Sequence, residues 1–262
     1  MKIIVCMKQV PAGKGIEIHP ETGALKRTSG STRTNPYDLF ALEVALQIRS
    51  IVGGTVTVLT MGPEQAQTMI RDAYAMGADD GVLLSDRRFA GADVLATSYA
   101  LSQAILALGD FDLIICGKQT TDGDTSQVGP AIAEHLNRPH AAWVGKIVDV
   151  TSKDITVQLD LASISQVSKL PYPCLITVDK DSNVPRLPSY RLKKQNAEHH
   201  IQKMTFADMP DQDTSHYGFA GSPTEVRKMF APDPIEKQVH IQGNIDEQVD
   251  QVVSLLAKKK YI

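Results

Sequence analysis

The 262-residue sequence has few cysteines and no long hydrophobic run. Its three cysteines, Cys6, Cys116 and Cys174, stand singly with no CxxC pair, a pattern that indicates neither a disulfide framework nor a zinc site. No stretch approaches the roughly 18 to 20 apolar residues of a membrane-spanning helix, and the N-terminal run 3–7 is too short for a signal peptide. We therefore expect a soluble, cytoplasmic protein in a reducing compartment, with no stable membrane insertion.

The sequence also has no large excess of positive or negative charge. The sequence has 27 Lys and Arg residues against 30 Asp and Glu residues, so the net charge is -3. No global field attracts nucleic acid or an anionic membrane, and we expect no nucleic-acid partner. Hydrophobic residues make up 42% of the chain and charged residues 22%, which is the ordinary globular range and excludes a disordered or fibrous chain.

Several familiar motifs are missing. No GxGxxG follows the first predicted strand, no GxxxxGK[ST] occurs, and no GxSxG nucleophile elbow is present. These absences disfavour an ordinary Rossmann dehydrogenase and a P-loop enzyme. The histidines, among them His135, His140, His199 and His200, suggest neither a metal site nor a triad and are predicted to be surface residues. We nominate no metal ligand and no catalytic side chain.

Hydrophobic periodicity predicts an α/β fold over residues 2–137. Short β-branched runs at 2–7, 55–59, 81–84 and 112–116 alternate with helical patterns that begin near residues 36, 63, 94 and 128. The run 112–116 is apolar on both faces, as a central parallel strand should be. We expect a doubly wound, mostly parallel sheet of the Rossmann-like, adenine-nucleotide-binding type.

The pattern changes after about residue 140. Residues 147–150 and 155–161 flank a short turn and predict an antiparallel hairpin, and residues 175–178 return to the sheet. Beyond Asn183 repeated prolines predict an irregular arm, which ends in an amphipathic helix at 245–259. The predicted organisation is a core domain at 1–184, a surface loop at 185–204 and an extended C-terminal arm with its helix at 205–262.

Loops at the carboxyl ends of the predicted strands form the candidate site, because ligands of open parallel sheets bind there. In loop 117–128, Thr125, Ser126 and the first N–H groups of the next helix can hold phosphate oxygens. Asp122 and Asp124 would repel phosphate, so we interpret them as partners of ribose hydroxyls, backbone N–H groups or Lys118, or as turn formers. The alternative is a plain Asp- and Gly-rich turn with a helix cap.

Two further loops precede helices. Asn35-Pro36-Tyr37-Asp38 supplies a cap and a first-turn proline, and a cap without ligand binding is the alternative interpretation. Gly91-Ala92-Asp93, with Thr97 one turn inside the next helix, is a further candidate anion site because the positive end of a helix dipole lies there.

Six segments together resemble the small (beta) subunit of electron transfer flavoproteins. They are VCMKQVP, NPYDLFALEVAL, VTVLTMGP, AYAMGADDGVLLSD, IICGKQTTDGDTSQVGPAIAEHL and NVPRLPSYRLKKQNAEHHI, which cover about residues 1–205. The resemblance implies a heterodimer with a larger alpha subunit, which binds most of the redox-active flavin, while the beta subunit holds an adenine nucleotide. The arm at 205–262 is then expected to pack on the alpha subunit.

The resemblance also implies which nucleotide is bound. In this family the beta site holds AMP in members that serve fatty-acid oxidation and a second FAD in electron-bifurcating members. The sequence resembles the bifurcating type through the stretch 122–125 and through FAGADVLATS at 89–98, although Val94 stands where that pattern has Thr. FAD is therefore the expected cofactor, with AMP as the alternative, and NADH is the expected substrate.

The resemblance assigns two sets of residues. The cofactor set is Cys6, Lys8, Asn35, Pro36, Tyr37, Asp38, Thr60, Met61, Phe89, Gly91, Asp93, Thr97, Gly117, Lys118, Gln119, Thr120, Thr121, Asp122, Gly123, Asp124, Thr125, Ser126, Gln127 and Val128. The partner-docking set, with Leu187 or Leu192 as its apolar anchor, is Arg186, Leu187, Tyr190, Arg191, Leu192, Lys193 and Lys194. Without the resemblance, residues 185–203 are a basic, proline-broken surface segment.

The function that follows is electron transfer within a complex. The expected reaction takes a hydride from NADH to FAD and sends the electrons to ferredoxin or flavodoxin and, through the alpha-subunit FAD, to a flavin dehydrogenase of acyl-CoA or lactate type. One alternative is a non-bifurcating beta subunit with structural AMP. Another, from a different class, is a stand-alone regulatory protein that binds an adenine nucleotide, although the arm has too little apolar density to fold unless it packs on something else.

Overall fold

The computed structural model describes residues 1–12, 31–161, 163–226 and 240–262. The chain divides into two compact units: the described part of the first ends at Val226, and residues 240–262 belong to the second. Among the helices that the structure describes, none is long and apolar enough to cross a membrane.

The first unit is built on one sheet of nine described strands. The parallel part runs in the order β11 (Gln202–Met204), β5 (Asp80–Leu84), β4 (Thr55–Met61), β1 (Lys2–Cys6), β6 (Leu113–Gly117), β10 (Cys174–Val178) and β7 (His140–Val150). Antiparallel strands β8 (Asp154–Leu161) and β9 (Ile164–Pro171) continue the sheet beyond β7. The predicted mostly parallel α/β fold and the hairpin are confirmed.

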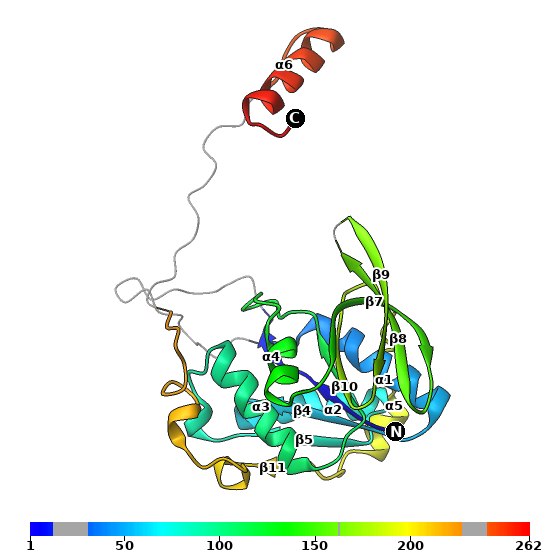
Figure 1. Cartoon of the computed structure of the whole chain (residues 1–262), viewed down its shortest axis with the longest axis vertical. Coiled ribbons are helices and arrows are strands. Elements are labelled where there is room, and N and C mark those ends of the chain that lie inside the picture. The colour runs from blue at the N-terminus through cyan, green and yellow to red at the C-terminus, as the bar shows by residue number, and fades with distance from the viewer. Residues whose placement is uncertain (13–30, 162, 227–239) are drawn as a thin grey trace. The chain divides into compact units, whose positions relative to one another are not determined.

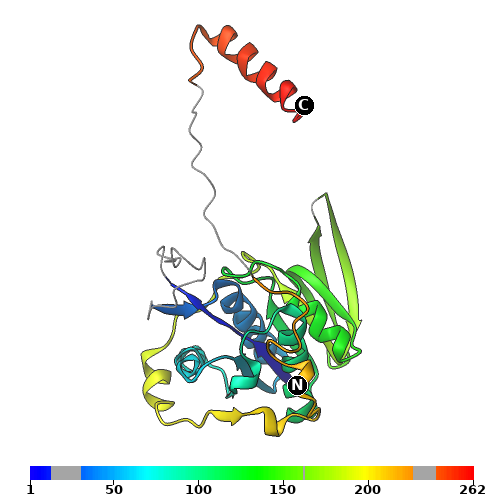
Figure 2. The ribbon, with the colours of Figure 1, turned by 90° about the vertical axis from the view of Figure 1, so that its left-hand side faces the viewer.

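Alternate residues of the central strands face two separate cores, because successive side chains of a strand point to opposite sides. On β1, Ile3 and Val5 pack with α1 (Pro36–Val52) and α2 (Gln67–Met76). Ile4 and Cys6 of the same strand pack with α3 (Val94–Leu108) and α4 (Val128–His135). Figures 1 and 2 show the two helix pairs covering opposite faces of the sheet. Burial on both faces explains why these strands are continuously apolar.

Two strands of the sheet lie where the sequence predicts none. β9 is largely exposed, and β11 pairs in parallel with β5 at the other edge. Beyond β11, the side chains of Phe206, Met209 and Tyr217 are buried in the core on the α3 side of the sheet. The arm was expected to begin at residue 205. Residues 202–226 instead belong to the first unit, because these few large side chains pack in its core.

The remaining elements are small. β2 (Gln9–Pro11) and β3 (Thr32–Thr34) form a two-stranded antiparallel ribbon, and α5 (Tyr190–Gln195) is a short helix. In the second unit, α6 (Ile245–Lys258) confirms the predicted terminal helix. It begins with a capping box, in which the side chains of Asn244 and Glu247 each accept the other's backbone N–H at 3.0 Å.

Candidate functional site

A cavity of about 550 Å³ opens at the carboxyl ends of β1, β4 and β6. Its walls are these strand ends, the first turn of α3, the loop that leads into α4 and the segment that ends at Val226. The predicted site residues that line it are Cys6, Lys8, Asp38, Met61, Phe89, Gly91, Asp93, Thr97, Gly117, Lys118, Gln119, Thr120, Gly123, Thr125, Ser126, Gln127 and Val128. The structure thus brings together the three loops singled out in the sequence.

The other predicted residues do not line the cavity. They are Asn35, Pro36, Tyr37, Thr60, Thr121, Asp122 and Asp124. Thr60 is buried between the two lining residues Leu59 and Met61 and points to the other side of β4. Most of the rest lie immediately beside the lining residues and hold them in place.

Sequence reasoning missed eight lining residues. They are Met7, Leu59, Val94, Leu101, Cys116, Gly129, Thr224 and Val226. The period of two along a strand could have identified Leu59 from Met61, and the parallel register that pairs Cys6 with Cys116 could have identified Cys116. No local signal identifies Thr224, because tertiary packing alone brings it to α3.

Asn35 links two of the loops. Its side-chain amide donates to Asp38 Oδ1 and to the carbonyl of Gln119, both at 2.9 Å, and its Oδ1 accepts the N–H of Thr121 at 3.3 Å. Asn35 occupies the predicted N-cap position of α1, with Pro36 in the first turn, but its side chain makes no capping hydrogen bond and bonds to the neighbouring loop instead. It is fully buried and holds loop 117–128 against the start of α1.

The two lysines of the site form ion pairs with partners that the sequence analysis did not assign. Lys8 Nζ lies 2.6 Å from Asp122 Oδ2, and Lys118 Nζ lies 2.8 Å from Asp179 Oδ2. Of the protein partners expected for Asp122, a backbone N–H is present, that of Gly123 at 2.8 Å, whereas Lys118 is not a partner. Burial alone would raise the pKa of Asp122, but the hydrogen bonds from Lys8, Thr120 and the Gly123 N–H, together with the charge of Lys8, outweigh it and the pKa is lowered.

The loop that leads into α4 makes a tight turn and leaves the first backbone N–H groups of this helix without a side-chain cap from Gln127. Asp124 and Ser126 both have left-handed backbones, with φ of 53° and 56°. The side chain of Gln119 holds them from inside the loop, because its Nε2 donates to Asp124 and its Oε1 accepts the Ser126 hydroxyl at 3.0 Å. No side chain caps α4 at Gln127, so the first N–H groups of α4 remain available at the cavity wall.

The start of α3 is different, because Asp93 caps it. Asp93 Oδ1 accepts the N–H of Ala96 at 3.1 Å, and Oδ2 accepts the hydroxyl and the N–H of Thr224 at 2.7 and 3.1 Å. Burial opposes ionisation, but these hydrogen bonds lower the pKa of Asp93. A carboxylate already occupies this helix start, which contradicts its interpretation as an anion site.

Asp38 is a buried carboxyl in the cavity wall. Its Oδ2 accepts the backbone N–H of Lys8 at 2.7 Å. Burial raises its pKa to about 7, even though that hydrogen bond, the one from Asn35 and the charge of Lys8 act in the opposite direction. Gly117 is packed against it, because a Cβ at Gly117 would lie 2.4 Å from Asp38 Oδ1. Only glycine allows this approach.

Two thiols face the cavity from neighbouring strands. Cys6 on β1 and Cys116 on β6 are paired in register, and both are buried. The hydrogen bond between the two thiols, together with burial, raises the pKa of Cys116. Cys116 is therefore a neutral, small and weakly polar part of the wall rather than a reactive thiolate.

Comparison with known proteins identifies the family. The family model described as the electron transfer flavoprotein domain matches residues 22–209. The chain belongs to the electron transfer flavoprotein beta-subunit family. It is 43% identical to a Protein FixA of Sinorhizobium fredii over 98% of this chain and 92% of that protein. It is also 40% and 39% identical to the beta subunits of electron transfer flavoproteins from Thermoanaerobacterium thermosaccharolyticum and Megasphaera elsdenii, over the full length of each chain.

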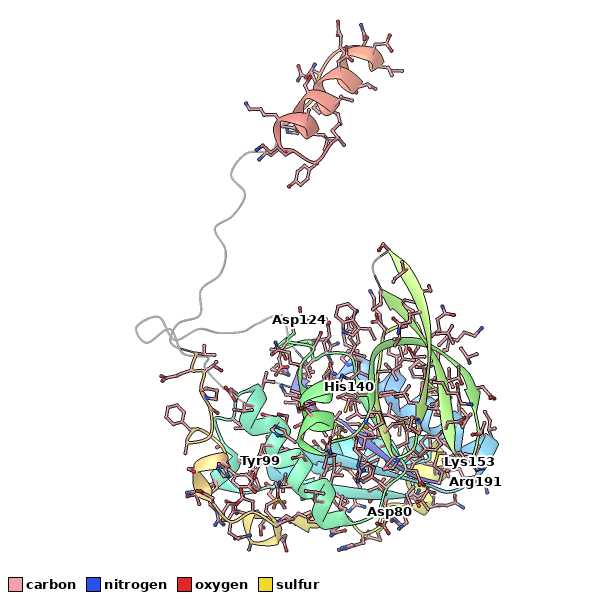
Figure 3. All side chains as sticks on the ribbon, viewed as in Figure 1. Asp80, Tyr99, Asp124, His140, Lys153 and Arg191 are labelled. Atoms are coloured by element: carbon pink, nitrogen blue, oxygen red, sulfur yellow. The ribbon has the colours of Figure 1, made fainter. Side chains whose placement is uncertain are left out.

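The predicted docking segment of this family member lies away from the cavity. In Figure 3, Arg191 lies at the lower right of the first unit, whereas Asp124 lies at its top. Arg186 is not free for a partner, because its guanidinium makes two hydrogen bonds, of 2.7 and 2.9 Å, to Glu43. Leu187 is 86% exposed, whereas Leu192 is half-buried, so Leu187 is the better placed of the two proposed apolar anchors.

Proposed function

We propose that this beta subunit holds FAD in the cavity and takes part in electron bifurcation. In this proposal it pairs with an alpha subunit, receives electrons from NADH, and serves ferredoxin or flavodoxin together with a dehydrogenase of acyl-CoA or lactate type. Membership of the family supports the electron-transfer role. The more specific parts of the proposal, the identity of the cofactor above all, rest on the residues of the site.

The open start of α4 carries the proposal for nucleotide binding. Three helices have first turns at the cavity: α3 is capped by Asp93, α1 places the carboxyl of Asp38 there, and α4 has neither a cap from Gln127 nor an acidic residue in its first turn. The N–H groups of α4, with the hydroxyls of Thr125 and Ser126, are suited to phosphate oxygens.

The shape of the cavity supports a dinucleotide. On the β4 side the walls are apolar, formed by Leu59, Phe89 and Leu101, and they suit an adenine ring. The phosphate-binding loop follows β6, and the cavity continues to Lys118. In this proposal the adenine lies on the β4 side and the phosphates at α4, and Lys118 contacts the rest of the dinucleotide, which AMP lacks.

When bound, FAD would accept two electrons from NADH and deliver them separately to two acceptors. The residues of this chain orient and desolvate the cofactor. Lys8 and Lys118 are neutralised by Asp122 and Asp179, so the site adds little net positive charge. Binding of phosphate then depends on oriented N–H groups rather than on side-chain charge.

The test is the stoichiometry of electron flow in the purified complex with an alpha subunit. We expect NADH to reduce ferredoxin only when the dehydrogenase acceptor is also present, with equal electron numbers to both. Reduction of the dehydrogenase acceptor alone, with ferredoxin unreduced under every condition, would contradict bifurcation and leave an ordinary electron carrier.

A further inference from the structure

Trp143 is the one tryptophan of the sequence, and its backbone is unusual. It lies on β7 with φ of 63°, a left-handed conformation that is costly for a bulky residue. The pairing of β7 with β10 shifts here, from Ala141 opposite Ile176 to Val144 opposite Val178, so β7 carries an extra residue. A bulge of this kind redirects a side chain.

The bulge is held by a specific contact and leaves the indole accessible. The N–H of Trp143 donates to the Thr177 hydroxyl at 3.0 Å. The residue nevertheless remains 38% exposed. Packing in the core does not explain why this strained conformation is maintained, because a core residue would be covered.

Lys118 connects this indole to the cavity. Its Nζ lies 4.6 Å from the centre of the Trp143 ring and 2.8 Å from Asp179 Oδ2. Its backbone N–H donates to the carbonyl of Val178 at 2.8 Å. Lys118 also lines the cavity. The ends of β6, β7 and β10 therefore place the Trp143 ring against Lys118, a residue of the cavity wall, although Trp143 itself is not part of that wall.

We propose that Trp143 and Lys118 form a stacking subsite for the isoalloxazine ring of the dinucleotide whose phosphates bind at α4. This inference rests on the proposed function, because AMP has no second ring to place there. An indole offers a large planar surface for an offset stack with a heteroaromatic ring. Asp179 neutralises Lys118, so the subsite suits an uncharged ring better than another phosphate.

The experiment is time-resolved flavin fluorescence of the full chain loaded with FAD, together with measured FAD and AMP content. An indole in contact with an excited flavin transfers an electron to it and shortens its emission to the picosecond range. Phenylalanine preserves a planar ring but does not donate an electron, so Trp143→Phe is the main variant. Tyr190→Leu, which removes an aromatic residue that is 82% exposed and outside the cavity lining, is the matched control.

We expect the wild type and Tyr190→Leu to show a dominant picosecond component. Trp143→Phe should lose it, with at least a tenfold longer mean lifetime at unchanged FAD content. Loss of FAD from Trp143→Phe with AMP binding retained also supports the subsite. An unchanged lifetime at full FAD content, or no picosecond component in the wild type, overturns the inference and leaves the proposed function standing. A wild-type chain that takes AMP and no FAD contradicts both.

Discussion

The side-chain amide of Asn35 donates a hydrogen bond of 2.9 Å to the main-chain carbonyl of Gln119, which lies 84 residues further along the chain. This contact joins the start of α1 to the loop that leads into α4. The position of loop 117–128 therefore depends on a buried amide from a different βα unit.

Replacing Asn35 with Ala should weaken nucleotide binding and destabilise the protein. The change leaves the carbonyl of Gln119 and the carboxyl of Asp38 short of a donor, at a cost of about 1–3 kcal/mol each. The free energy of unfolding and the nucleotide content per chain are the measurements. Asn183→Ala is the matched control, because the Asn183 amide also donates to a distant carbonyl, that of Phe40, at 3.0 Å. It should lose stability and keep nucleotide; equal nucleotide loss in both variants would contradict the account.

Gly117→Ala should damage the site far more than Gly123→Ala. At Gly117 the added Cβ would lie 2.4 Å from Asp38 Oδ1 and 2.8 Å from the backbone of Tyr37, so β6 or α1 must shift. At Gly123 the nearest atom is 3.5 Å away, an ordinary contact. We expect Gly117→Ala to lose about 1–3 kcal/mol of stability and most of its nucleotide, as measured by thermal unfolding and released ligand. Similar behaviour of the two variants would show that the close approach has no role.

The stability of the protein should carry a pH dependence that comes from Asp38. Its pKa rises from an ordinary 3.8 to about 7 on folding. The stabilising contribution of Asp38 to the free energy of unfolding is therefore fully present below pH 3.8 and is lost as the pH rises through 7. Relative to Asp38→Asn, the wild type should lose up to about 4 kcal/mol between pH 4 and pH 8.

Chemical denaturation of both proteins across this range gives the difference. Asp93→Asn is the control, since the pKa of Asp93 is lowered and its contribution is lost only as the pH falls below its usual value. The difference between wild type and Asp93→Asn should stay flat from pH 5 to pH 8. If the difference in the free energy of unfolding between wild type and Asp38→Asn also stayed flat, Asp38 would not be a buried neutral carboxyl.

Thiol labelling should report occupancy of the cavity. Cys6 and Cys116 line it, whereas Cys174 is buried on β10 and does not. We expect a small maleimide to label Cys6 and Cys116 slowly in nucleotide-free protein and to be blocked by bound nucleotide. Labelling of Cys174 should be unaffected by nucleotide, and mass spectrometry of the peptides separates the three. Protection of Cys174 to the same degree would indicate global stabilisation rather than contact at the cavity.

The parallel sheet could be predicted from the sequence because its strands are short, apolar on both faces and separated by helical patterns. β9 could not, since its side chains are mostly exposed and it is stabilised by its ladder with β8. β11 could not either, because its pairing with β5 brings together segments more than a hundred residues apart. Neither strand has the local hydrophobic pattern on which the prediction depends.

Part of the candidate site could also be predicted from the sequence. The loops at the strand ends could be identified, because the carboxyl edge of a parallel sheet brings them together. The ion-pair and hydrogen-bond partners of the charged residues in these loops could not be identified. Lys8 and Asp122 come from different βα units, and the capping of α3 by Asp93 is completed by Thr224 from the end of the first unit. Such pairings are decided by tertiary packing, which the local sequence does not encode.

The cofactor content of the purified heterodimer tests the central claim most directly. The chain is co-purified with its alpha subunit, the ligands are released by denaturation, and FAD and AMP are quantified per heterodimer. Two FAD and no AMP are the predicted result. One FAD with one AMP would contradict the claim and assign the cavity to a structural mononucleotide.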